Sequence, residues 1–113
     1  MTDTRVVLVT APDEEVAAGI CRGLLEEGLV ACGNMVPGVR SLYRWQGEIH
    51  DETEVLIVLK TDRQRVAELV RRLPAVHPHE VPEVLVLAVE AGHAPYLEWV
   101  SRETHGPAGS RSP

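Results

Sequence analysis

Four aliphatic runs that alternate with two amphipathic segments predict an α+β fold in the order βαββαβ, the ferredoxin-like sandwich, followed by a short C-terminal helix. The length of 113 residues is typical of one domain. Hydrophobic residues make up 44% and charged residues 25%, as in ordinary globular proteins. We predict a single domain over residues 1–104, with a long hairpin between its second and third strands. Residues 105–113, rich in Gly, Pro and Ser, are expected to form a flexible tail.

The first strand is predicted by the continuous aliphatic run Val6–Val9. A helix start follows at Thr10–Glu15, where a Thr or Asp supplies the cap, a proline comes early and acidic side chains suit the helix dipole. Apolar residues then recur every four positions from Val16. Gly28 is the expected residue just beyond the helix end, where a left-handed backbone is common.

A long hairpin arm is predicted next. Leu29–Val36 is expected to be the second strand, and Pro37–Gly38 indicates a turn or a bulge within the extended segment. The run continues through Val39–Trp45 to a hairpin tip at Gln46–Gly47. The return arm, Glu48–Glu54, is polar enough to lie exposed.

The arm leads back into a buried third strand at Glu54–Leu59. Asp62 is expected to cap the second helix, and Pro74 to limit it. One apolar face of this helix has the spacing i, i+3, i+4, i+7. Its members are Val66, Leu69, Val70 and Leu73.

The last part of the domain begins with the proline-pinned segment His77–Glu83, which we expect to be extended. It leads into a fourth strand at Val84–Val89. Ala94–Glu103 is predicted to form the terminal helix, with Tyr96, Leu97 and Val100 on its inner side.

The predicted strands are apolar on both sides over several residues, so one sheet face remains to be covered after two helices have covered the other. A chain of this length cannot cover both faces alone. We therefore expect a homo-oligomer that forms through the sheet face and the hairpin arm. Tyr43, Trp45 and Trp99 are the predicted interface aromatics, because aromatic residues are enriched at interfaces.

Charge and motif content exclude several function classes. The formal net charge is −6, which disfavours binding to nucleic acid. The two cysteines form no C-x-x-C pair, and no apolar run approaches the length of a membrane span. The polar start indicates no secretory signal, so we expect a soluble cytoplasmic protein with reduced thiols. Catalysis is not expected, because there is no Ser-His-Asp order, phosphate loop or zinc-protease motif.

Six motifs follow one another in order along residues 5–101. They are Thr10-Ala11-Pro12, Leu29-Val30-Ala31-Cys32-Gly33-Asn34, Ser41 to Ile49, Leu59-Lys60-Thr61, His77-Pro78-His79-Glu80-Val81-Pro82-Glu83 and Tyr96-Leu97-Glu98-Trp99-Val100. Together they resemble the CutA family, the divalent-cation tolerance proteins. The resemblance implies a ferredoxin-like subunit in a tight homotrimer that is cytoplasmic in bacteria. It also implies an association with copper binding and with tolerance of divalent metal ions.

Cys32 and His77 are the candidate metal ligands, because they match the family's cysteine and its His-Pro motif. A thiolate suits Cu(I), and an imidazole suits Cu(II) or zinc. Both residues also have structural interpretations. For Cys32 the favoured interpretation is a small packed side chain, whereas His77 is equally read as a ligand and as a hydrogen-bonding group near the end of the second helix.

His79 stands where the family usually has tyrosine, which adds a possible ligand. His77 and His79 are two positions apart, so an extended chain would point both to one side. Glu80 and Glu83 are the nearest candidates for a third ligand, or they are solvated.

A second candidate site is a ligand cleft between subunits, where Lys60 with Glu83 or Glu48 would bind a small anion. Three functions follow from these candidates. The first is a homotrimer that binds copper or another divalent cation. The second is a trimeric small-ligand sensor resembling the PII-type signalling proteins. The third is a structural trimer whose effect on metal tolerance is indirect.

Overall fold

A computed structural model describes residues 1–104, and the predicted flexible tail over 105–113 lies outside the described residues. The predicted βαββαβ order with a terminal helix is confirmed. Four antiparallel strands form one sheet in the order β2-β3-β1-β4. The elements are β1 (Thr4–Ala11), α1 (Glu14–Glu26), β2 (Cys32–Trp45), β3 (Glu48–Asp62), the 3-10 turn η1 (Arg63–Arg65), α2 (Val66–Val76), β4 (Leu85–Ala88) and α3 (Ala94–Glu103).

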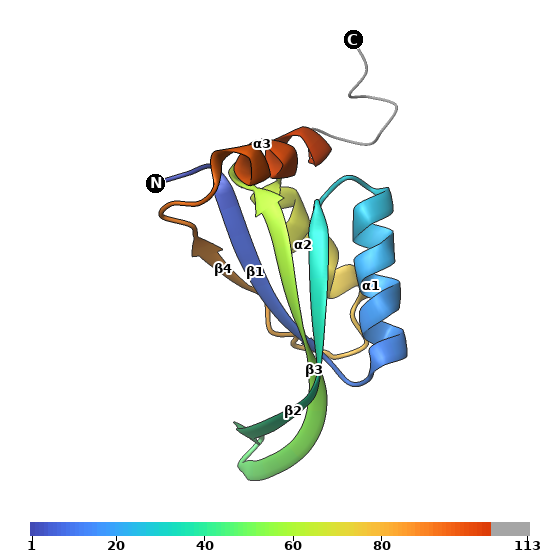
Figure 1. The fold of residues 1–113 in the computed structure, drawn as a ribbon. Helices are drawn as coiled ribbons and strands as arrows, with labels where there is room; N and C mark the ends of the chain where they lie inside the picture. Colours follow the sequence, from blue (N-terminus) through green and yellow to red (C-terminus); the bar gives the residue numbers. More distant parts are fainter. Residues whose placement is uncertain (105–113) are drawn as a thin grey trace.

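Helices α1 and α2 cover one face of the sheet, and α3 crosses the strand ends at the opposite side of the molecule from the arm (Figure 1). Helix α1 begins at Asp13, whose carboxylate accepts a 2.8 Å hydrogen bond from the Val16 amide. Of the two predicted caps, the structure uses this aspartate. Gly28 (φ +72°) lies just beyond the helix end, as predicted, and there the Gly28 and Leu29 amides turn back to bond the Leu25 and Leu24 carbonyls.

The second strand starts three residues later than predicted. Leu29 to Ala31 are buried but lie outside β2. The Leu29 amide is used by the end of α1, and its carbonyl accepts a 2.6 Å hydrogen bond from the Thr61 hydroxyl. These bonds hold the segment away from a regular ladder, which begins where Cys32 pairs with Lys60.

The arm is one continuous hairpin of β2 and β3, and Pro37–Gly38 is a bulge within it. Val36 pairs with Leu56 and Val39 pairs with Glu54, so two residues of β2 face one of β3. Gly38 supplies the positive φ of +72° that this bulge uses. At the tip, Gln46 and Gly47 both have positive φ, which is the backbone of a two-residue hairpin loop.

The second helix differs from prediction at both ends. Asp62 caps as expected, but it caps η1, accepting from the Gln64 amide at 3.0 Å, and α2 follows. The helix continues past Pro74 to Val76, so the expectation that Pro74 limits it was wrong. A proline in the last turn removes only one backbone hydrogen bond there. Val70, predicted on the apolar face, is exposed.

The fourth strand is shorter than the predicted Val84–Val89. Only Leu85–Ala88 pairs with β1, opposite Arg5–Leu8. The ladder leaves Leu85 and Leu87 on the face away from α1 and α2, where they are 54% and 47% exposed.

The core lies between the sheet and the two helices α1 and α2. Alternate residues of β1 and β3 point into it, among them Val7, Val9, Ile57 and Leu59, all fully buried. The other set of alternate residues forms what we call the open face. Its apolar members are Val6, Leu8, Val36, Leu56, Val58, Leu85 and Leu87, each half-buried or exposed.

Gly33 should be required for the contact between β2 and α1. A Cβ at Gly33 would lie 2.8 Å from Cys21 Sγ and 3.1 Å from a Leu59 methyl, both in the core. We expect Gly33→Ala to lower the free energy of unfolding by about 1–3 kcal/mol, measured by chemical denaturation.

The matched control is Gly23→Ala in α1, where an added Cβ meets no atom within 4 Å and the backbone is helical. This change should raise the free energy of unfolding by about 0.5–1 kcal/mol. Adding Cys21→Ala to Gly33→Ala should recover part of the loss. Equal stability of the two glycine variants would contradict the close contact.

Candidate functional site

A cleft of about 690 Å³ lies where the arm leaves the body of the protein. One wall comes from the arm, another from the segment that follows α2, and the floor from the end of β1. This segment carries the His-Pro-His-Glu motif. The lining residues are Thr10, Arg40, Ser41, Leu42, Tyr43, Trp45, Glu54, Pro78, His79, Glu80, Val81 and Glu83.

The bulge decides which arm side chains share a sheet face with Glu54. Before the bulge, even-numbered residues of β2 share a face with the even-numbered residues of β3. After it, Val39 pairs with Glu54 and Tyr43 with His50, so odd-numbered residues take that face. Tyr43 and Trp45 therefore stand on the same face as Glu54.

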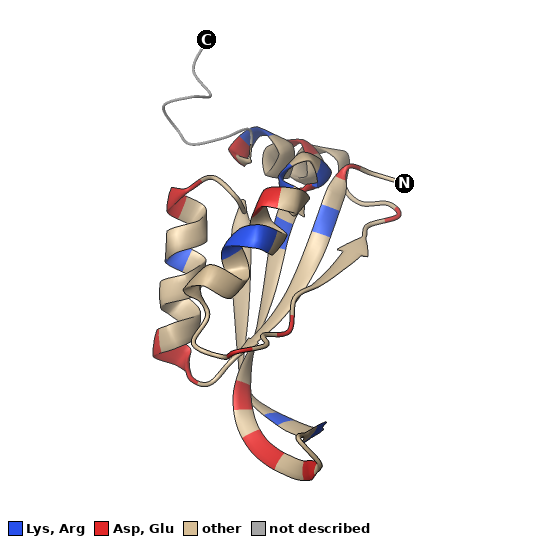
Figure 2. Cartoon of the chain, turned by 180° about the vertical axis from the view of Figure 1, so that it is seen from behind, with Lys and Arg blue, Asp and Glu red and all other residues tan. Residues whose placement is uncertain are grey.

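The cleft carries an excess of negative charge. Glu54, Glu80 and Glu83 line it, and Glu54 is only 8% exposed. Arg40 is the only arginine or lysine that lines the cleft within residues 1–104, and Asp51 holds its guanidinium with two hydrogen bonds of 2.9 and 2.6 Å. Figure 2 shows the acidic residues of β3 along the arm, next to the arginines of β2.

The acidic residues around Tyr43 change the pKa of its phenol. Its hydroxyl donates a hydrogen bond to Glu52, and its ring stacks on His50 with centroids 5.1 Å apart. The hydrogen bond, desolvation and the charges of Glu52 and Glu54 together raise the pKa of Tyr43 to about 12. The phenol therefore stays neutral at physiological pH.

His77 fixes the outer wall of the cleft and uses both of its ring nitrogens to do so. Nδ1 accepts the His79 amide hydrogen at 3.0 Å, and an amide can only donate. Nε2 therefore carries the ring proton and donates it to the Thr10 carbonyl at 2.7 Å. His77 is buried, so this neutral ring connects the end of β1 to the start of the His79 segment.

The structure places His79 and Glu83 on one cleft and Cys32 and Lys60 elsewhere. The His79 ring is exposed, contacts the His77 ring at 4.8 Å and makes no hydrogen bond to any part of residues 1–104. Cys32 pairs with Lys60, which pairs with Val6, whereas His77 bonds to Thr10. Four residues along a strand span about 13 Å, so one chain does not bring Cys32 to either histidine.

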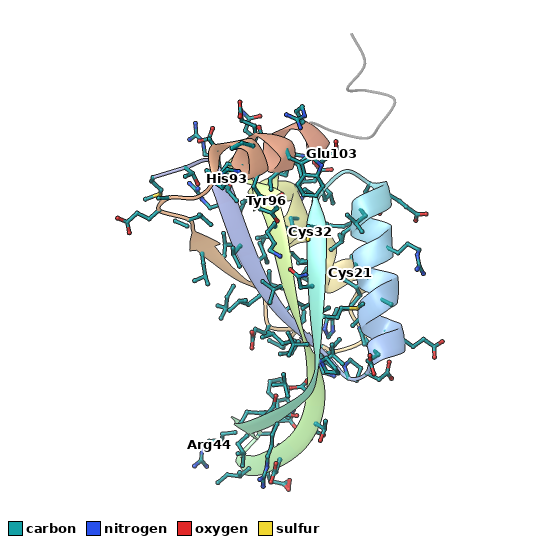
Figure 3. The ribbon with its side chains drawn as sticks, viewed as in Figure 1. Cys21, Cys32, Arg44, His93, Tyr96 and Glu103 are labelled. Carbon is teal, nitrogen blue, oxygen red and sulfur yellow. The ribbon has the colours of Figure 1, made fainter. Side chains whose placement is uncertain are left out.

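Cys32 belongs to a separate polar cluster under α3. The Lys60 ammonium lies 3.7 Å from its sulfur and also bonds the Asn34 side chain. Burial raises the pKa of Tyr96, and its hydrogen bond with Cys32 and that residue's charge add to the shift. Figure 3 shows Tyr96 above Cys32, with Cys21 on α1 at the other side of the sheet. Burial, and secondarily Cys32, raises the pKa of the Cys21 thiol.

The predicted interface aromatics lie in two places. Tyr43 and Trp45 are about 40% exposed on the arm. Trp99 lies on α3, where its ring contacts Tyr96 at 5.6 Å. Glu48, the other predicted partner of Lys60, sits at the arm tip opposite Trp45 and outside the cleft.

The donor set for a metal ion is incomplete in the part of one chain that the structure describes. Within residues 1–104, no three His, Cys, Asp or Glu side chains are grouped so that they would hold an ion.

None of the helices in this range is long and apolar enough to span a bilayer.

Sequence reasoning missed the role of Glu54, which it treated only as the boundary between arm and strand. A signal was present, because Pro37–Gly38 was identified as a possible bulge. Counting one extra residue there pairs Val39 with Glu54 and places Tyr43 and Trp45 on the glutamate's face.

Comparisons with known proteins agree with this fold. The family described as CutA1 divalent ion tolerance protein matches residues 5–103. The divalent-cation tolerance protein CutA of Thermus thermophilus is 46% identical over 99 residues, which cover 88% of this chain and 96% of that protein. The chain spans about 60% of the length of its relatives from Xenopus laevis and Bos taurus.

Solved structures are equally similar. The crystal structure of CutA from Xylella fastidiosa matches with a TM-score of 0.88 at 37% identity, covering 91% of this chain and 99% of that one. The PII-like protein CutA from Nostoc sp. PCC 7120 matches with a TM-score of 0.83 at 38% identity, covering 89% and 97%.

The hydrogen bonds of His77 predict a stability effect in metal-free protein. His77→Ala leaves the Thr10 carbonyl and the His79 amide without their partner. We expect the free energy of unfolding to fall by about 1–3 kcal/mol in the presence of a chelator, measured by chemical denaturation.

His93→Ala is the control, because His93 is exposed and its side chain makes no capping hydrogen bond. It should change the free energy of unfolding by less than about 0.5 kcal/mol. A His77→Ala variant that unfolds at the wild-type denaturant concentration would show that His77 does not hold the segment.

Proposed function

The chain belongs to the CutA1 divalent ion tolerance family, and from that premise we propose that it is a homotrimer that binds divalent metal ions such as copper without catalysing a reaction. The observation that carries this proposal is the acidic cleft at the base of the arm. Its exposed donors are an imidazole, His79, and two carboxylates, Glu80 and Glu83. Imidazole and carboxylate ligands suit Cu²⁺ and Zn²⁺.

His79, rather than His77, is the proposed imidazole ligand. Both nitrogens of His77 are engaged within the chain, and ligation would require one of those bonds to break. His77 is then a positioning residue, since it holds the amide of His79 itself. Metal sites commonly need such supporting bonds to orient their ligands.

Cys32 is a second proposed donor, for a softer ion such as Cu(I). Its thiol is half-exposed on the open face, and ligands from a second copy would have to complete its site. The Lys60 ammonium at 3.7 Å opposes a cation at this point. The acidic cleft is therefore the favoured metal site.

Trimer formation is supported by the open face. Seven aliphatic side chains lie on it, and Val36, Leu85 and Leu87 are each about half exposed. A contiguous apolar surface of this kind usually marks an interaction site. Sister copies that cover it would also supply the metal donors that one chain lacks, and Tyr43, Trp45 and Trp99 are the proposed interface aromatics.

We place the protein in the cytoplasm, because both of its cysteines are free thiols and a reducing compartment keeps them so. The alternative function is a PII-like ligand sensor. It is supported by the likeness to the PII-like protein from Nostoc and by a cleft much larger than a metal ion. The proposed sensor site on Lys60 and Glu83 would need two copies, because one chain keeps these residues in different clusters.

Copper binding tests the metal proposal. Isothermal titration of the wild-type protein with Cu²⁺ in a non-chelating buffer should give saturable binding with a simple ratio per subunit. We expect His79→Ala to weaken this binding by about tenfold or more, since an imidazole ligand is lost.

His93→Ala should bind copper like the wild type, and Cys32→Ser should change Cu²⁺ binding little. If the His79→Ala isotherm superimposes on the wild-type isotherm, the cleft is not the copper site. If copper binding is lost only in Cys32→Ser, the metal site is instead the cluster under α3.

Assembly is tested by light scattering. We expect a particle with three times the subunit mass of 12.4 kDa. Leu87→Glu on the open face should reduce this mass, because it places a charge in an apolar contact.

Val70→Glu on α2 is the matched control, since Val70 is 42% exposed and Leu87 is 47% exposed. It should leave the mass unchanged. A wild-type protein that scatters as a single subunit would contradict the trimer.

A further inference from the structure

Glu54 is a buried carboxylate with no partner in its own chain. The residue is 8% exposed, and no hydrogen bond or ion pair within residues 1–104 reaches it. Burying a charge without a partner is unfavourable. The cleft does not relieve this charge, because Glu80 and Glu83 line it as well and Arg40 is held by Asp51. Glu54 is therefore suited to a positive charge from outside the chain.

Arg44 is the basic side chain of the arm that has no partner in the described chain. The arm carries two arginines, of which Arg40 is bonded to Asp51 and Arg44 makes no bond within residues 1–104. Arg44 is exposed, and Figure 3 shows it at the far end of the arm, pointing away from the body. The other basic residues without a bond in this range lie on the helices and not on the arm. They are Arg22 on α1, Arg71 on α2 and Arg102 on α3.

One chain cannot bring Arg44 and Glu54 together. In the hairpin Arg44 pairs with Ile49, which is five residues from Glu54, or about 17 Å along a strand. The two side chains also belong to opposite faces, since Tyr43 and Trp45 share the face of Glu54 and Arg44 lies between them in the strand. A subunit that carries two complementary sites far apart binds other copies head to tail, and such contacts can close into a ring.

We propose that Arg44 of the partner subunit enters the acidic cleft and pairs with Glu54, so that each subunit of the trimer completes the cleft of the next. This pair rests on the proposed homotrimer and adds the residues that hold it together at the arm. A closed ring of three copies leaves neither an arginine nor a glutamate of this kind unpaired.

The chemistry of the arm supports this contact. Tyr43 and Trp45, on either side of Arg44, are the proposed interface aromatics, and arginine is itself enriched at interfaces. A guanidinium can also bind a carboxylate with two parallel hydrogen bonds, which suits a buried pair. Because only Glu54 is neutralised, the charges of Glu80 and Glu83 remain for the proposed metal ion.

The test is a double-mutant cycle on metal-free protein with a chelator present. The particle mass is followed by light scattering through a dilution series. Glu54→Gln and Arg44→Gln should each raise the concentration at which the trimer dissociates by about tenfold or more, because each leaves the other charge buried without its partner. The double variant should dissociate at a concentration no higher than either single variant, since it removes both charges together.

Arg40→Gln is the matched control, because Arg40 lies on the same strand and face as Arg44 but is bonded to Asp51 in its own chain. It should change the concentration of dissociation by less than about fivefold, as expected for an exposed ion pair. When it is combined with Glu54→Gln, the two effects should multiply, as for residues that do not touch.

Two results would overturn the proposal. One is an Arg44→Gln trimer that dissociates at the wild-type concentration. The other is a double variant in which the effects of Glu54→Gln and Arg44→Gln multiply. Either result leaves the trimer itself intact, whereas a wild-type protein with the mass of one subunit would contradict the trimer and this pair together. Because no metal is present, the copper titration remains an independent test of the metal proposal.

Discussion

The one-residue bulge at Pro37–Gly38 is the constraint on which the site depends. It changes which residues of β2 share a face with Glu54, from even-numbered before the bulge to odd-numbered after it. Without the extra residue, Leu42 and Arg44, rather than Tyr43 and Trp45, would share the sheet face of Glu54. The bulge uses a φ of +72° at Gly38, which a residue with a side chain adopts only with strain. A local backbone property thus sets the chemistry of a cleft several residues away.

The two faces of the sheet have different roles. The face toward α1 and α2 is closed and tightly packed, as the fit of Cys21 against Gly33 shows. The open face is apolar along its middle and polar at both ends. Cys32 and Lys60 lie at one end under α3, and the acidic cleft lies at the other, where the arm begins. In the proposed trimer, covering the apolar middle would bring second copies close to both polar ends, so assembly and ligand binding would be coupled through one surface.

The sequence predicted most of the fold because local signals agreed with it. Asp13, Gly28, Asp62 and Gln46–Gly47 act as caps and turns where the pattern placed them. The errors had two causes, a tertiary bond in one case and the position of a proline near a helix end in the other. Leu29 is taken out of the strand by Thr61, and Pro74 stays inside α2 because little of the helix follows it. The site was harder to predict than the fold. In the sequence, Cys32 and His77 were both candidate metal ligands, but in the structure they lie at different positions along the strands of the sheet. The pairing of β2 with β3 places Cys32 beside Lys60, whereas His79 and Glu83 line the cleft from the segment after α2.

The cleft combines a rigid frame with an unsatisfied charge. His77 holds one wall through two hydrogen bonds that fix its tautomer, and the bulged hairpin holds the other. Within this frame, Glu54 is 8% exposed and has no hydrogen-bond partner among residues 1–104. Burying a carboxylate without a partner is unfavourable. In the proposed metal-binding function, the cation would therefore meet a negative charge that the folded chain already holds at the cleft.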